Sequence, residues 1–435
     1  MLAPNTINDK RATVLLLVLW CIAMLSAATI SPPEDYRGSS FELQSILPPT
    51  WIKLAKLVSR GGTLVVLAYS VVRFAADPRL TRAILGILPI ALYTAWAVLS
   101  TSWSALPSVS LQQSFTLGML VMLAVMIGLC WRSVEDTSQL LWLLTSVMTC
   151  LAAGLLLLRF AAPQYGALTK DASGVFHSTA AGAMSSLTLL LLLLAAFLWG
   201  WKWSWQLLVP GLLIHTAVMV VGGNRLSLVL CIFLGCSVAI IYLPKQRVAV
   251  LAVIGGILGT IYLAIDSRLT WLRATLGQFG TFASQGQSRK SLESLSGREE
   301  MWEIMWKSFQ QAPLKGHGFF VTSSTGDIFI WDDWGNWTAH NWLLQLLVTT
   351  GLIGGVLLIS GLLGVVVGVA WKYRTDPRLA QFLGILFLWY VGWGILNASY
   401  LGPLQPESIV FAVVLGLAIS LLIRDKPPAS LESQP

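Results

Sequence analysis

Long apolar runs with almost no charged residues recur along the whole chain, and they restrict its fold more than any other feature. The first run, Ala12 to Ile30, follows Lys10 and Arg11 and has the roughly 20 residues that a membrane-spanning helix needs. Its basic start resembles a signal peptide, but because the chain beyond it stays apolar we interpret it as an uncleaved first helix. Only 11% of the residues are charged, against about 25% in soluble domains. The chain is therefore predicted to be an all-α polytopic membrane protein.

Hydropathy predicts twelve spans in one helical bundle, at 12–30, 57–76, 83–100, 111–131, 140–160, 179–199, 206–223, 226–243, 248–265, 352–371, 379–397 and 408–423. An even number of spans puts both ends of the chain on the same side. The short loops on that side hold fourteen basic residues and those on the other side hold seven. By the positive-inside rule, both termini are expected in the cytoplasm and the long loop outside.

The predicted spans divide the chain into four parts. Residues 1–265 form an N-terminal bundle of nine spans, 266–338 a large outer loop, 339–423 the last three spans, and 424–435 a cytoplasmic tail. The five cysteines all lie in apolar runs without metal-ligand spacing, so neither a disulfide nor a zinc site is expected. The net charge of +8 comes without a soluble basic domain, which favours anionic lipid or a phosphorylated substrate over nucleic acid.

The outer loop holds most of the polar residues that could carry chemistry. Capping-box spacing at 296–299 predicts the start of a helix. One stripe of that helix consists of Arg298, Trp302, Met305 and Phe309. The stripe predicts an amphipathic helix on the outer leaflet. A guanidinium beside the free N–H groups of a helix start suits a phosphate group, and pairing with neighbouring glutamates or lipid is the alternative.

A second arginine interrupts two apolar runs. Arg225 follows Gly222-Gly223-Asn224 and is expected at the outer membrane boundary. An arginine at such a depth is costly and is a candidate for a functional site. Snorkelling of its side chain to lipid phosphate is the alternative.

Four histidines occur in the chain. His340 begins the helix that leads into the tenth span, and histidine suits proton transfer near neutral pH; a hydrogen-bonded histidine at the membrane interface is the alternative. His317 lies between two glycines after Pro313, where backbone freedom is the evident need. His177 lies in another outer loop, and His215 is expected to be a structural residue within a span.

The tryptophans around His340 could stack on sugar rings or anchor the loop at the interface; they are Trp331, Trp334, Trp337 and Trp342. The nearby aspartates show no metal-ligand spacing; they are Asp327, Asp332 and Asp333. The chain has no glycine-rich nucleotide loop and no serine nucleophile motif. No cofactor and no metal is expected.

Taken in order, these residues resemble the O-antigen ligase/O-antigen polymerase superfamily of bacterial membrane glycosyltransferases. The motifs that carry the resemblance lie at about 225–354 and are Asn224-Arg225, Gly297-Arg298 before Trp302, Pro313 to Phe319, Ala339-His340-Asn341, and Gly351 to Gly354. The Trp103-Ser104 loop and the stretch from Gly174 to Gly182 also fit the amino-terminal half of that family. Asn224 is a departure, because serine is more usual there.

The resemblance implies a GT-C-like fold in the inner membrane and transfer of a glycan from undecaprenyl diphosphate to a sugar hydroxyl of lipid A–core on the periplasmic face. The transfer would be metal-independent and inverting. Arg225 and Arg298 would bind the diphosphate, His340 would act as general base, and Asn341 would orient it. Further residues that could line the substrates are His317, Trp302, Trp337, Tyr400 and Glu407.

Other activities share parts of this pattern. An O-antigen or exopolysaccharide polymerase and a protein O-oligosaccharyltransferase use the same donor chemistry, and the compact outer loop without an appended domain favours the ligase. A lipid-linked oligosaccharide flippase or another transporter would usually show repeat symmetry and polar sites near the bilayer midplane. Here the polar residues collect on one face, so we expect an active site between the outer loop and the bundle.

Overall fold

The computed structural model describes residues 12–17, 50–131, 133–163, 167–168, 176–242, 298–325, 339–397 and 405–424. Within these residues the chain is helical without strands, and eight helices are long and apolar enough to cross a membrane. The predicted all-α membrane architecture is confirmed to this extent. The number of twelve spans stays a prediction, because the span at 248–265 and much of the outer loop lie outside the described residues.

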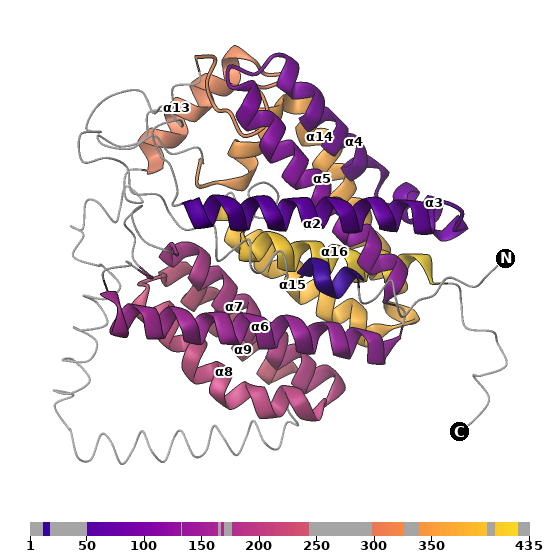
Figure 1. The fold of residues 1–435 in the computed structure, drawn as a ribbon, viewed down its shortest axis with the longest axis vertical. Coiled ribbons are helices and arrows are strands. Elements are labelled where there is room, and N and C mark those ends of the chain that lie inside the picture. Colours follow the sequence, from indigo (N-terminus) through magenta and orange to yellow (C-terminus); the bar gives the residue numbers. More distant parts are fainter. Residues whose placement is uncertain are drawn as a thin grey trace.

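The described helices follow one another in the order α2 (Thr50–Phe74), α3 (Pro78–Gly86), α4 (Leu88–Leu99), α5 (Pro107–Cys130), α6 (Val134–Ala161), α7 (Ser178–Leu194), α8 (Lys202–Val221), α9 (Arg225–Tyr242), α13 (Arg298–Gln311), α14 (Trp342–Trp371), α15 (Pro377–Leu396) and α16 (Pro406–Ile423). Figure 1 shows α4, α5, α13 and α14 in the upper part of the view and α6 to α9 in the lower part, with α15 and α16 between them.

The centre of the bundle is formed by α5, α7 and α16, which are the most deeply buried spans. The helices α5 and α16 approach closely at two glycines. A Cβ added to Gly128 would collide with Ile419, and one added to Gly416 would collide with Ile127. Small residues of this kind let membrane helices pack backbone against side chain, where lipid supplies no hydrophobic driving force.

The predicted span at 83–100 is not one straight helix. Helices α3 and α4 meet at Ile87 with a bend of 76°. Pro89 lies in the first turn of α4, where its missing N–H does no harm, but its ring cannot follow a continuous helix. The span predicted at 57–76 is also different, because α2 begins at Thr50 and only its part from Gly61 is a shorter apolar helix.

A second break lies inside α14, at the level where the outer loop meets the bundle. Gly351 has φ 68° and ψ −171°, which interrupts the helix. The loop after α13 supplies the hydrogen bonds that the break leaves open: Leu352 N donates to Pro313 O at 2.8 Å, and His317 N donates to Val348 O at 3.1 Å. The span predicted to begin at residue 352 is thus the second half of a longer broken helix.

Glycines are required where this loop enters the break. Gly351 would collide with the Leu314 carbonyl if it carried a Cβ, and Gly316, at φ 68°, would collide with the Thr349 carbonyl. The loop also reaches the end of the chain's third predicted span, since Phe319 N donates to Ser100 Oγ at 2.8 Å, just after α4. The motif from Pro313 to Phe319 therefore acts as a structural clamp on α14 and α4.

Candidate functional site

Four helices present their N-terminal ends to one region, and each has a basic residue at or beside its first turn. These residues are His177 before α7, Arg225 in α9, Arg298 at the described start of α13, and His340 before α14. Helix N-termini carry partial positive charge and free N–H groups. The region therefore combines four basic side chains with four positive helix ends.

The start of α9 is held against the start of α7. Asn224 caps α9 by accepting from Ser227 N at 3.0 Å, and its side-chain amide donates to Thr179 O at 3.2 Å. Gly182 of α7 lies so close that an added Cβ would collide with Asn224. The unusual asparagine before Arg225 thus connects two helix starts, which fixes where the Arg225 side chain begins.

The C-terminal end of α15 fixes the side chain of Arg298. Its Nη1 donates to the carbonyl oxygen of Leu396, 3.1 Å away, in the last turn of α15. Burial lowers the pKa of Arg298, and the positive charge of Arg225 lowers it further. The two arginines are thus close enough to repel each other, as residues that share one anionic ligand would be.

His340 has an unusual backbone and an unusual pKa. Its φ of 47° lies in the left-handed region, which non-glycine residues adopt at a cost of about 1–3 kcal/mol. Burial, together with the charges of Arg298 and His177, lowers the pKa of His340 to about 4. The imidazole is therefore neutral at neutral pH and able to accept a proton.

The residue before His340 is held from two sides. Trp302 Nε1 donates to the Ala339 carbonyl at 2.8 Å, and Ala339 N donates to Gln345 Oε1 at 2.6 Å. Ala339 is fully buried and Gln345 is 7% exposed. These two bonds explain how His340 keeps its left-handed backbone. Trp302 therefore positions His340 by holding the residue before it. Gln345 has the same role, and no local sequence pattern pointed to it.

Asn341 was expected to orient His340, but its side chain bonds elsewhere. Its Oδ1 caps α14 by accepting from Leu344 N at 2.9 Å, and its Nδ2 donates to Ile395 O at 3.2 Å. Asn341 therefore acts on His340 through the helix start and not through a bond to the ring that the structure describes.

His177 was noted in the sequence without a role. The structure makes it the N-cap of α7, where its Nδ1 accepts from Thr179 N at 3.2 Å. Its charge is one of those that lower the pKa of His340. The available signal was a histidine followed by Ser-Thr directly before an apolar run, which is a helix-start pattern. Histidine is uncommon as an N-cap, so the pattern was easy to pass over.

The remaining predicted residues are less central. His317 is 6% exposed and bonds through Nε2 to Ser308 O at 2.8 Å. Ser308 lies ten residues after Arg298, or about 15 Å along α13, so the ring belongs to the clamp and not to the arginine group. Glu407 is fully buried at the start of α16. Trp337 and Tyr400 lie outside the described residues.

The predicted apolar stripe of α13 is present, but it faces the protein. Met305 and Phe309 are buried and form a cluster with Ala339 and Val348. The expectation that this face lies on the outer leaflet is therefore wrong, since α14 and the segment before it already cover it. On the exposed side of the helix, Lys307 Nζ donates to Glu303 Oε1 at 2.7 Å.

His215 takes the structural role expected of it. It is fully buried in α8, and its two ring nitrogens lie 3.1 Å from the hydroxyls of Thr149 and Ser185. Within the described part of the chain, no three His, Cys, Asp or Glu side chains come together in a way that could hold a metal ion.

The charges that shift the pKa values of Arg298 and His340 are all positive. Burial and the charge of Arg225 account for the lowered pKa of Arg298, and burial together with Arg298 and His177 accounts for that of His340. Basic side chains gathered at helix N-termini favour an anion as a ligand.

Residues 210–359 match the family model described as O-antigen ligase. This match supports the resemblance of the chain to the O-antigen ligase/polymerase superfamily. The matched segment contains Arg225, Arg298 and His340, but neither His177 nor the end of α15 that bonds Arg298. Among curated proteins, none matches the chain. The superfamily is associated with ligase or polymerase activity of the glycosyltransferase kind.

Proposed function

We propose that this protein is an O-antigen ligase, which transfers a glycan from a polyprenyl-diphosphate donor to a sugar hydroxyl of lipid A–core at the periplasmic surface of the inner membrane. The observation that carries the proposal is the group of Arg225, Arg298, His340 and His177 at four helix starts, in which Arg225 lowers the pKa of Arg298 while Arg298 and His177 lower that of His340. A diphosphate is the anion that such a group would best accommodate.

The arginines would act on the leaving group. As the bond between the anomeric carbon and the diphosphate oxygen breaks, negative charge grows on that oxygen. Arg225 and Arg298, already in place, stabilise this charge more in the transition state than in the ground state. The Leu396 carbonyl holds one edge of the Arg298 guanidinium, which fixes the orientation of the remaining donors.

His340 would remove the proton from the acceptor hydroxyl as its oxygen attacks the anomeric carbon. In the free protein its pKa of about 4 makes it a weak base. A bound diphosphate brings negative charge next to the imidazole and offsets the repulsion from Arg298, so the pKa of His340 rises toward its ordinary range. The donor thereby strengthens the base that its own reaction requires. One direct displacement inverts the anomeric carbon, with the proton passing to His340.

The test uses the purified full chain with lipid-linked glycan and lipid A–core. Arg225→Gln and Arg298→Gln should each lower transfer by about 10²-fold or more, whereas Arg378→Gln, an exposed arginine in the first turn of α15, should transfer normally. EDTA should have no effect on the rate. Glycan joined to glycan, with no lipid A–core product, would instead indicate a polymerase. Full transfer by Arg298→Gln would refute the assigned site.

A further inference from the structure

A basic cavity lies at the other end of the bundle from the histidine and arginine site. It has a volume of about 510 Å³ and is lined by Arg82, Gly86, Gly364, Lys372, Leu422, Ile423 and Arg424. The helix α14 joins the two places: it begins just after His340 and ends at Trp371, beside Lys372. Thirty helical residues span up to about 45 Å, which is the thickness of a bilayer with its headgroups.

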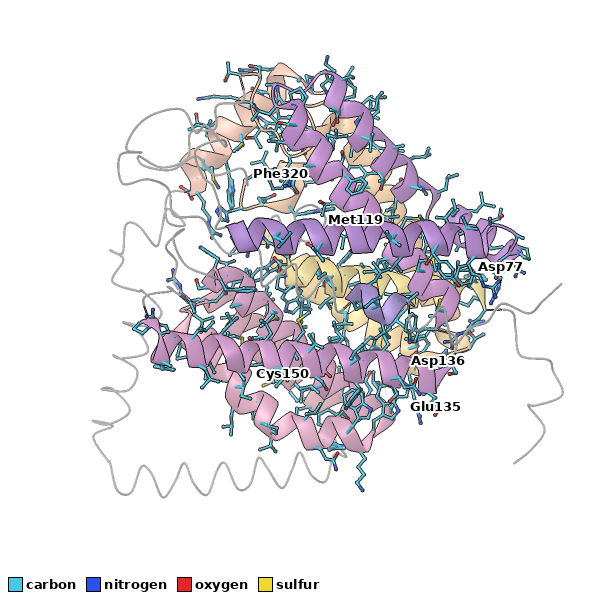
Figure 2. The ribbon with its side chains drawn as sticks, in the orientation of Figure 1. Asp77, Met119, Glu135, Asp136, Cys150 and Phe320 are labelled. Atoms are coloured by element: carbon cyan, nitrogen blue, oxygen red, sulfur yellow. The ribbon has the colours of Figure 1, made fainter. Side chains whose placement is uncertain are left out.

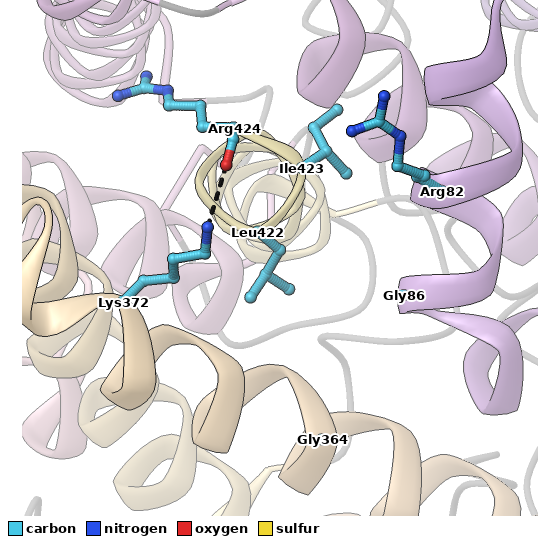
Figure 3. A pocket seen from close by; sticks show the side chains of 7 residues that line it. All are labelled: Arg82, Gly86, Gly364, Lys372, Leu422, Ile423 and Arg424. Atoms are coloured by element: carbon cyan, nitrogen blue, oxygen red, sulfur yellow. Dashed lines mark hydrogen bonds between the residues drawn. The ribbon is translucent and has the colours of Figure 1, made fainter. Parts of the chain in front are cut away.

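Three cations reach this cavity from three different elements. Arg82 comes from α3, Lys372 from the end of α14, and Arg424 from the end of α16. Figure 3 shows Arg82 and Lys372 on either side of the end of α16. Lys372 Nζ donates to the Arg424 carbonyl at 3.0 Å, which holds the ammonium at the rim. None of the described residues that line the cavity is acidic.

The nearest described carboxylates contact the cations around the cavity without lining it. Asp376 accepts from Arg424 Nη1 at 3.2 Å, and Asp77 is bonded to Arg79. Figure 2 labels Asp77 and Asp136 on one side of the molecule, away from Phe320 in the outer loop. The Nε of Arg424 is buried without a hydrogen bond in the described residues. The described carboxylates therefore offset part of the positive charge from outside the cavity, whose described lining residues carry only cationic and apolar side chains or are glycines.

The floor of the cavity is apolar. Leu422 and Ile423 line it, and a Cβ added to Gly86 or Gly364 would meet nothing within 4 Å. A free phosphate ion gains nothing from such a floor. A phospholipid matches both parts, because its phosphate can lie among the cations while the upper acyl chain lies on the glycine backbone. Basic pockets between membrane helices are known to suit anionic headgroups.

We propose that this cavity binds the headgroup phosphate of an anionic phospholipid in the leaflet opposite the transfer site. Arg82 and Lys372 hold the phosphate, Arg424 closes the third side, and Gly364 leaves room for the first part of an acyl chain. The site is independent of the glycan chemistry, since none of its residues belongs to the arginine and histidine group.

The experiment titrates the purified, delipidated full chain in detergent with cardiolipin, phosphatidylglycerol or phosphatidylcholine, and counts bound lipids by native mass spectrometry. Anionic lipid should saturate one site at concentrations where phosphatidylcholine does not bind. Arg82→Gln and Lys372→Gln should each lower the affinity for phosphatidylglycerol roughly fivefold. Arg378→Gln removes the same charge from an exposed position that does not line the cavity and should leave the affinity unchanged.

A second pair of variants leaves every charge in place. Gly364→Leu fills the apolar floor and should weaken lipid binding, whereas Gly384→Leu, at an equally open position in α15, should not. Inorganic phosphate in excess should not displace the lipid. Equal affinity for phosphatidylcholine, an equal loss in Arg378→Gln, or binding of phosphate without lipid would each overturn the proposal.

Discussion

Asn341 donates to the carbonyl oxygen of Ile395, 3.2 Å away, and the next carbonyl along the chain, that of Leu396, accepts from Arg298. Both carbonyls belong to the last turn of α15, which is the negative end of that helix. One helix end therefore sets the spacing between the start of α13 and the start of α14. Whatever moves this turn moves Arg298 relative to His340.

The first prediction concerns His340 itself. His340→Asn should lower transfer by about 10²- to 10⁴-fold, the usual contribution of a general base. Asparagine tolerates left-handed backbone better than other side chains of its size, so this variant should fold as the natural protein does. His340→Ala should lose activity and also some thermal stability. A turnover number for His340→Asn equal to that of the natural protein, measured with both substrates saturating, would exclude the general-base role.

The pKa of His340 should respond to the charges around it. Arg298→Gln removes a cation that lowers this pKa, so the pKa should rise from about 4 toward 6.5. Inorganic pyrophosphate added to the natural protein should shift it in the same direction. The measurement is ¹³C-histidine NMR of the detergent-solubilised chain, and His177→Asn serves as a further variant with the same expected sign. A pKa that does not change in any of these cases would contradict the proposed coupling.

Stability should depend on pH through the same group. Because the folded-state pKa of His340 is lowered to about 4, the unfolded chain binds the proton more tightly, so folding stability is fully present above about pH 6.5 and is lost as the pH falls toward 4. The loss is at most about 1.4 kcal/mol per pH unit. Between pH 7 and pH 5, the Tm of the natural protein should therefore fall more than the Tm of His340→Asn. Parallel curves would speak against a buried neutral imidazole.

The two bonds to Ala339 should matter to catalysis although neither partner is assigned to the substrate. Gln345→Leu leaves the buried Ala339 N–H without its acceptor, and Trp302→Phe removes the donor to the carbonyl. Each should lower kcat by about tenfold or more with little change in KM, since His340 loses its position and not the binding of donor. Trp306→Phe, on the exposed side of α13, is the matched control. A change confined to KM would point to direct substrate contact instead.

The break in α14 should tolerate no side chain. Gly351→Ala meets both a left-handed backbone and the Leu314 carbonyl, so it should destabilise the protein by about 1–3 kcal/mol or more. Gly364→Ala lies in the same helix with open space around it and should be neutral or stabilising by up to about 1 kcal/mol. Comparing the apparent Tm of the two variants in detergent checks this. A Gly351→Ala protein as stable as Gly364→Ala would mean that the break is not required.

The sequence was sufficient for the features that depend on local composition. Apolar runs predicted most of the described helices to within a few residues, and the helix that starts near Arg298 followed from its capping pattern. The break at Gly351 and the bend at Ile87 were missed because hydropathy averages over a window and does not register the backbone at one position. Pro89 gave a local signal for the bend, which the length of the apolar run outweighed.

The partners of the site residues depended on tertiary contacts and could not be predicted. Nothing local connects Arg298 to Leu396 or Trp302 to Ala339, which lie 98 and 37 residues apart. His317 illustrates the opposite error, because a histidine between glycines suggested function, whereas its ring is bonded inside the clamp. The roles given to the arginines and to His340 stay predictions.

The family match ends at residue 359, whereas the carbonyls that hold Arg298 and Asn341 lie beyond it in α15. The segment that the family model matches is thus shorter than the segment that holds the site residues in place. A chimera that joined residues 210–359 of this chain to the remaining helices of a distant relative would carry both arginines and His340, yet take its geometry from a foreign helix end. The starts of α13 and α14 and the end of α15 are therefore expected to change only as a set.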